Sequence, residues 1–150
     1  PRPAADTELL ARVTGGRIGQ ATAFDLSVYR QERRTLIELL ELMAAGQNRV
    51  RLLKAAEYIG KKEREEFEKE LDLMTSLLRD VFLLAGGGSQ TEIVNVDVAD
   101  KLRQLAEKIG LAKSISWSEK LREVRRGLRV NINRQIAMEA ALLGLAEERV

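Results

Sequence analysis

The 150-residue sequence contains no cysteine and no histidine. These absences exclude disulfides, thiol nucleophiles, imidazole general bases and metal sites built on thiolate or imidazole ligands. Aromatic residues make up only 4% of the chain. No apolar run is long enough for a signal peptide or a membrane span, so we expect a soluble protein. Because the chain begins at Pro1 instead of methionine, we also expect it to be a piece of a longer one.

Neither sign of charge is in excess. The chain has 25 lysines and arginines against 23 aspartates and glutamates, which gives a formal net charge of +2. Such a balance produces no strong overall field to attract nucleic acid. With 32% charged residues, the composition is typical of helices with solvated faces.

What the sequence does contain is apolar residues at helical spacing along nearly its whole length. No segment shows the sustained alternation of a strand, so we predict an all-α helical bundle. Gly46, Gly60 and Gly110 are expected to end helices, and Asp25 and Asp97 to cap the starts of two others. The segment "GGGSQTEIVN", about 86–95, is expected to be a flexible linker. The expected helices cover about 6–13, 18–24, 26–45, 47–60, 61–85, 98–109, 114–128 and 134–145.

Several apolar residues are expected to face a core. Val28, Val50 and Tyr58 are predicted to point inward, and Trp117 is expected to anchor the core. From Met74 to Leu84 the apolar arc widens beyond one stripe. A helix that packs both inside its own domain and against neighbouring proteins would show this pattern, as would a helix in a larger internal core.

A cluster of carboxylates between Glu63 and Glu70 suggests either a site for a hard metal ion and acid/base chemistry or a solvated helix face. The glutamates interleave with lysines and arginines at a helix start, where they favour the helix dipole and pair locally. This pattern favours the solvated face. An enzyme built on carboxylates is disfavoured, because spacing alone places no acid/base pair on a shared concave surface.

A basic stripe late in the chain consists of Arg122, Arg125, Arg126 and Arg129. It could contact phosphates. The favoured alternative is the solvated side of a helix whose other side carries Trp117, or a set of ion pairs with an acidic neighbour. No aromatic residues interleave with the arginines, as a platform for single-stranded nucleic acid would require.

The segment "GGRIGQA", 15–21, superficially suggests a phosphate-binding loop at a helix start. It lacks the lysine and hydroxyl of a P-loop and lies between two helices instead of after a strand. We therefore predict no nucleotide site, no metal site and no cofactor in this chain.

Three segments in this order resemble the C-terminal part of the delta prime subunits of the bacterial clamp loader of DNA polymerase III. "GGRIGQA" resembles the end of that family's AAA+ lid, "LLRDVFLL" (77–84) a stretch of its collar domain, and "NINRQIAMEAALLGL" (131–145) the start of its last helix. Leu77 replaces a frequent tryptophan, Arg134 a proline and Arg17 a small hydroxyl residue. Gly19 stands where the ATP-hydrolysing gamma/tau subunits would carry an arginine, which favours the delta prime type.

The resemblance implies that residues 1–25 end an AAA+ lid and that residues 26–150 form the helical collar domain. It implies a cytoplasmic, non-catalytic fragment whose ATPase core lies upstream of Pro1. The implied partners are the gamma/tau and delta subunits, which the collar would hold together in DNA replication, with DNA reached only through the full complex and no membrane. The alternative is a helical nucleic-acid-binding module that uses the stripe Arg122 to Arg129.

The resembling segments also supply candidate interaction residues. Asn131 and Asn133 can satisfy backbone groups at the end of one helix and the start of the next. That turn would bring Ile136 and its neighbours back onto the bundle. The candidates are Arg79, Asp80, Asn131, Asn133, Met138 and Leu142.

Overall fold

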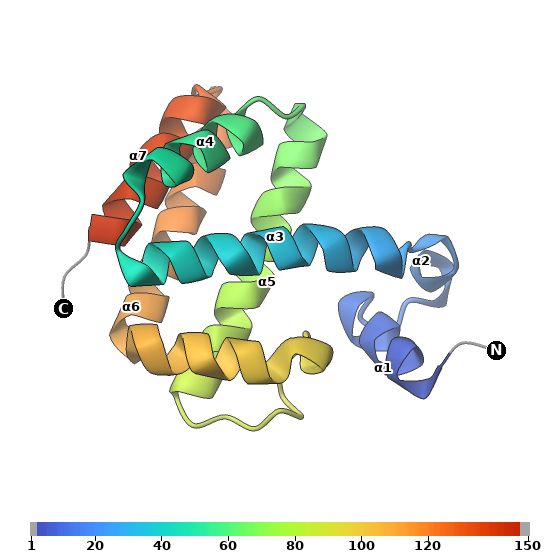
Figure 1. Cartoon of the computed structure of the whole chain (residues 1–150). Helices are drawn as coiled ribbons and strands as arrows, with labels where there is room; N and C mark the ends of the chain where they lie inside the picture. Colours follow the sequence, from blue (N-terminus) through green and yellow to red (C-terminus); the bar gives the residue numbers. More distant parts are fainter. Residues whose placement is uncertain (1–2, 148–150) are drawn as a thin grey trace.

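The computed structural model describes residues 3–147, apart from the side chain of Ile18, and every regular element in that range is a helix. This confirms the all-α prediction (Figure 1). No helix in the described range is long and apolar enough to cross a membrane. The elements are α1 (Ala4–Val13), α2 (Ile18–Ala23), α3 (Leu26–Ala45), α4 (Arg49–Gly60), α5 (Arg64–Ala85), the 3-10 turn η1 (Val96–Val98), α6 (Ala99–Gly127), the 3-10 turn η2 (Leu128–Val130) and α7 (Arg134–Glu147).

Local chemistry fixes both ends of α3. The Asp25 carboxylate accepts hydrogen bonds from the backbone amides of Ser27, at 2.9 Å, and Val28, at 3.2 Å, which satisfies donors of the first turn. Gly46 ends the helix in the left-handed conformation, with φ 62°. Both positions confirm the prediction from sequence.

Helix α6 consists of two arms that meet at Gly110. This residue has φ 69° and ψ 178°, which breaks the helical path and which an L side chain rarely adopts. Figure 1 shows the arm 99–109 crossing the bundle and the arm 111–127 running along α5. The break confirms Gly110 as a helix end. The predicted cap at Asp97 is wrong, because α6 begins only at Ala99 and the carboxylate of Asp97 is bound by Arg33.

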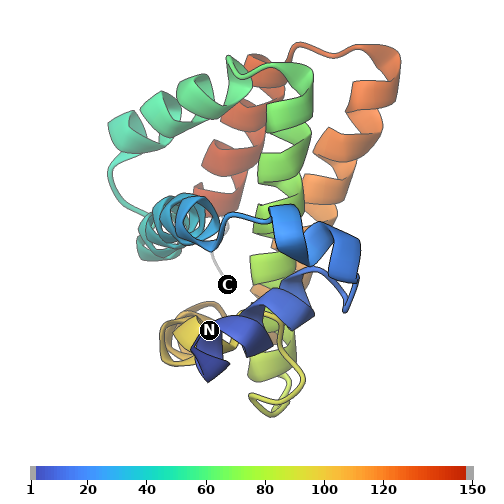
Figure 2. The same ribbon diagram turned by 90° about the vertical axis from the view of Figure 1, so that its right-hand side faces the viewer.

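Helix α5 runs through the centre of the bundle and makes its most extensive contact with α6 (Figures 1 and 2). Its side chains from Phe67 to Val81 form the middle of the main apolar core, and Leu77 and Leu78 are fully buried. Trp117 of α6 is also fully buried, as predicted. Helices α4 and α7 cross in close contact at Gly60. A Cβ added at Gly60 would lie only 2.4 Å from the Cα of Gln135. A larger residue at Gly60 would push the two helices apart.

Four apolar residues predicted to face the core point outward instead. The exposed fractions are 51% for Val28, 63% for Val50, 66% for Tyr58 and 63% for Ile136. In α4 the buried face is the one that meets α7, and it carries Leu52, Ala56, Ile59 and Gly60. The ring of Tyr58 lies instead under the ammonium of Lys62, 4.9 Å from the ring centroid.

Helices α1 and α2 lie at one end of α3, and α1 contacts η1 at the end of the linker (Figures 1 and 2). Leu9 and Leu10 of α1 are buried but do not belong to the main apolar core. Polar contacts hold this end instead. The guanidinium of Arg12 donates to the carbonyls of Thr91, at 2.8 Å, and Ile93, at 2.7 Å.

Candidate functional site

Asp80 lies at the centre of a buried polar cluster where the linker crosses α5. Its side chain is fully buried, and its carboxylate accepts hydrogen bonds from the amide of Val94, at 3.0 Å, and from the backbone and side-chain nitrogens of Asn95, both at 2.8 Å. Three donors compensate the cost of burying this charge. Linker residues Ile93 and Asn95 are themselves at most 1% exposed. The expected flexible linker is therefore wrong for this part of 86–95.

Arg33 extends the cluster to α3 and to η1, just before α6. This arginine is 2% exposed and donates to both carboxylate oxygens of Asp97, at 2.8 and 2.5 Å, and to Asn95, at 3.1 Å. Burial alone would raise the pKa of Asp97, but the hydrogen bonds and charge of Arg33 hold that pKa below its usual value. We call Tyr29, Arg33, Asp80, Asn95 and Asp97 the Asp80 network.

Tyr29 completes the network. Its hydroxyl donates to the side-chain oxygen of Asn95 at 2.6 Å. Burial raises the pKa of Tyr29 to about 12, so the hydroxyl stays protonated and remains a donor at neutral pH. Every charged group in the network is bound by another member, so the network joins α3, α5, the linker and η1.

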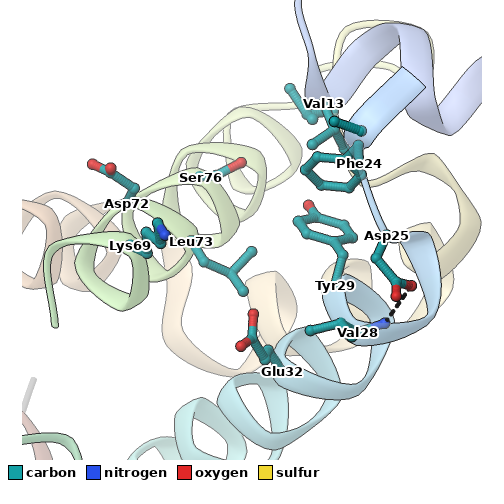
Figure 3. Close-up of a pocket in the computed structure, with 12 residues that line it drawn as sticks. Val13, Phe24, Asp25, Val28, Tyr29, Glu32, Lys69, Asp72, Leu73 and Ser76 are labelled. Atoms are coloured by element: carbon teal, nitrogen blue, oxygen red, sulfur yellow. Dashed lines mark hydrogen bonds between the residues drawn. The ribbon is translucent and has the colours of Figure 1, made fainter. Parts of the chain in front are cut away.

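A half-open pocket of about 450 Å³ adjoins the network between α3, α5 and the ends of α1 and α2. Figure 3 shows Phe24 and Tyr29 on one side, with their ring centroids 5.4 Å apart, and Leu73 of α5 reaching towards them. The Asp25 carboxylate at its edge already caps α3, and the hydrogen bonds from Ser27 and Val28 lower its pKa. The pocket is therefore an apolar recess, lined by Val13, Ala23, Phe24, Asp25, Val28, Tyr29, Glu32, Lys69, Asp72, Leu73, Ser76 and Val94.

The carboxylates from Glu63 to Glu70 mostly form a solvated face, as predicted. Glu65 pairs with Lys69 at 3.0 Å, and Glu68 pairs with Arg64 at 2.9 Å. Within residues 3–147 no group of three or more acidic side chains is placed to hold a metal ion. Glu70 is the exception to the solvated pattern, because its side chain is only 9% exposed and it binds Lys62. Burial lowers the pKa of that lysine, but Glu70 raises it above its usual value.

The two candidates from the collar-like segment face different surroundings. Asp80 is the buried centre of the network, whereas the side chain of Arg79 is 57% exposed. Its guanidinium lies 3.7 Å from the carboxylate of Asp80, which already accepts three shorter bonds. Arg79 is thus the member of this pair that solvent or a partner can reach.

The asparagines before α7 act largely as expected. Asn131 adopts the left-handed conformation, with φ 55° and ψ 47°, and turns the chain after η2. The side-chain oxygen of Asn133 accepts from the amide of Ile136 at 3.1 Å, as a helix cap does. Met138 and Leu142 are fully buried in the main core, so they stabilise this chain and do not present themselves to a partner.

The basic stripe lies on the solvated side of the second arm of α6, opposite Trp117, and continues into η2 with Arg129. Arg125 pairs with Asp72 of α5. Arg122, Arg126 and Arg129 are exposed, and among the described residues none of them makes an ion pair. Both favoured alternatives for the stripe therefore apply: Arg125 forms an ion pair with an acidic neighbour, and the other three arginines lie on a solvated face.

The sequence reasoning missed the Asp80 network. One signal was present, since Arg33 lies three residues before Leu36 and seven before Leu40, in phase with a buried stripe. A charged residue at such a position needs a buried partner. Its partners Asn95 and Asp97 are more than sixty positions away, and no local pattern indicates them.

Comparison with known proteins gives one result. A family model described as "DNA polymerase III, delta subunit, C terminal" matches residues 29–147. No curated protein and no solved structure matches the sequence.

Proposed function

The chain belongs to the family formed by the C-terminal domains of DNA polymerase III delta subunits, and we propose that it is the collar part of a subunit of the delta prime type. The family is a non-catalytic component of the clamp loader, which supports a role in the clamp-loading complex. In the proposed role the chain helps to hold the gamma/tau and delta subunits together and reaches DNA only through the complete complex.

The observation that carries the collar assignment is where the family match lies on the fold, whereas the delta prime type rests on the resemblance of the segment "GGRIGQA" and on Gly19. It begins within α3 and ends with α7, so it covers the bundle and leaves out α1 and α2. The separate packing of Leu9 and Leu10 supports the same division. We therefore propose that residues 1–25 are the end of an AAA+ lid and that residues 26–150 are the collar domain.

Reconstitution tests the proposal. The purified chain is mixed with gamma/tau and delta subunits of the same organism and analysed by size-exclusion chromatography. We expect it to migrate with them. Adding the full delta prime subunit in excess should displace the chain, whereas adding excess delta should not. Failure to join any mixture would contradict the collar role, and displacement by delta alone would contradict the delta prime assignment.

A second candidate function rests on the unpaired arginines of the basic stripe. Arg122 and Arg126 on α6 and Arg129 in η2 leave three cations free to contact phosphates. Binding of this kind would weaken steeply as salt increases. Fluorescence anisotropy with labelled duplex and single-stranded DNA at about 50 mM salt measures it, and no binding at that salt would remove this candidate.

A further inference from the structure

The second arm of α6 and α5 form a surface seam whose register is fixed at two points. Asp72 pairs with Arg125 at one end, and a Cβ at Gly86 would lie 3.7 Å from Leu111 at the other. Fourteen residues separate the two points on each helix. The helices run in opposite directions (Figure 1), so from the two fixed points we infer that steps of four and three residues along both helices place side chains in neighbouring pairs. These pairs are Gly86 with Leu111, Phe82 with Ile115, Arg79 with Ser118, Thr75 with Arg122 and Asp72 with Arg125.

One end of this seam is apolar. The exposed fractions are 39% for Phe82, 44% for Leu111 and 42% for Ile115. The register places these three large side chains together, whereas single exposed apolar residues scattered over a surface are ordinary. They also show how much of the wide apolar arc of α5, from Met74 to Leu84, remains at the surface. Most of that arc, including Leu77 and Val81, is sealed in the chain's own core, and Phe82 is where it emerges.

The middle of the seam is positively charged. Arg79 is 57% exposed, and its nearest carboxylate is already bound by three other donors. Arg122 makes no ion pair among the described residues, whereas Arg125 is neutralised by Asp72. Two cations therefore stand within one or two helical turns of the apolar end.

We propose that this seam docks one helix of a neighbouring clamp-loader subunit. The fitting helix carries apolar side chains four residues apart, which cover Phe82 and Ile115, and carboxylates further along, which face Arg79 and Arg122. The seam is about 21 Å long, the length of fourteen helical residues, which is enough to contact about four turns of a partner helix. This inference rests on the proposed collar function.

Charge favours a neighbouring protein over two other occupants. A second copy of the chain in a symmetric dimer would bring the same ten seam residues to each other, and the only carboxylate among them, Asp72, is already paired with Arg125. Nucleic acid would use the arginines but would gain little from covering Phe82, Leu111 and Ile115, because its contacts are dominated by phosphate.

The test compares four forms of the chain for binding to purified gamma/tau and delta subunits by biolayer interferometry. Phe82→Ser with Ile115→Ser should weaken binding at least tenfold, as loss of a central apolar anchor typically does. Arg79→Glu with Arg122→Glu should weaken binding by roughly the same factor and reduce its salt dependence. The control, Val130→Ser with Ile136→Ser, changes residues 77% and 63% exposed at another surface and should bind like the unchanged chain. Circular dichroism checks that all forms are folded.

Each other outcome overturns the inference in a distinguishable way. If the unchanged chain binds but the seam variants bind equally well, the docking seam is wrong and the collar function stands. If the unchanged chain binds no loader subunit, the collar function fails and the seam proposal fails with it. Loss of DNA binding only in Arg79→Glu with Arg122→Glu, or a dimer that dissociates in Phe82→Ser with Ile115→Ser, would assign the seam to nucleic acid or to a second copy.

Discussion

The bundle from α3 to α7 and the junction with α1 and α2 are held together by different forces. The bundle buries a continuous apolar core around α5, with Leu77, Leu78 and Trp117 fully enclosed. The junction buries little of that core and depends on Arg12, on the ion pair of Arg30 of α3 with Asp6 of α1 at 2.6 Å, and on the Asp80 network. The bundle should therefore respond to lost volume, and the junction to lost charge and to pH.

The largest effect is expected from a cavity in the bundle. Leu77→Ala removes a fully buried side chain at the centre of α5 and should lower the free energy of unfolding by about 2–5 kcal/mol. Urea denaturation followed by the fluorescence of Trp117, the single tryptophan, measures the change. Leu111→Ala, at a residue 44% exposed, is the control and should cost much less. Equal losses in both variants would mean that the apolar core is not what distinguishes the bundle.

A smaller and more local effect is expected at the junction. Asp80→Ala leaves the donors of Val94 and Asn95 without their acceptor, at a cost of about 1–3 kcal/mol. Hydrogen exchange should accelerate in 89–98 and in α1 while α7 remains protected. If α7 loses protection as strongly as the linker, the two regions share one cooperative unit and the contrast between them disappears.

Acid should weaken the junction before the bundle. Arg33 lowers the pKa of Asp97 in the folded state. The ion pair between them therefore stabilises the fold fully above the ordinary pKa of 3.8, and this stabilisation is lost as the pH falls through the lower pKa of the folded state. Asp97→Asn should lower the free energy of unfolding by about 1 kcal/mol at pH 7. Below pH 4 the stability of this variant should fall less steeply with pH than that of the unchanged chain. Thermal unfolding from pH 3 to pH 7 checks this, and parallel curves for both proteins would remove Asp97 as the cause.

The smallest effect is expected for the exposed ion pair between α5 and α6. The side chains of Asp72 and Arg125 are 69% and 42% exposed. Because solvent screens their charges, such a pair contributes about 0–1 kcal/mol to the free energy of unfolding. A double-mutant cycle with Asp72→Ala and Arg125→Ala measures the coupling directly. Coupling well above about 1 kcal/mol would show that charge also holds the bundle together.

Local signals in the sequence predicted the helices and most of their ends. Asp25, Gly46 and Gly110 act through their own backbone and nearest neighbours, so their roles could be inferred without a structure. The buried face of each helix was harder to predict. Tyr58 and Ile136 have suitable spacing, but which side of a helix is covered depends on the neighbour that packs there, here α7 against α4.

Polar contacts over long sequence separations could not be predicted at all. Asp80 binds the linker fifteen residues later, and Arg33 binds Asp97 across sixty-four positions. Glycine-rich composition therefore indicated a flexible linker, although Ile93 and Asn95 are enclosed. The exposed arginines were predicted as a stripe, but the seam beside Phe82 depends on the register between two helices, which only the fold provides.

The bend at Gly110 divides α6 into two arms that point in different directions. One arm starts beside Asp97 at the junction, and the other starts with Leu111 on the seam. The first arm is roughly 16 Å long, so rotating it by about 5° at the pivot moves its far end by roughly 1.4 Å. The pivot at Gly110 therefore connects the junction, where α1 contacts η1, with the seam that we propose as a docking surface.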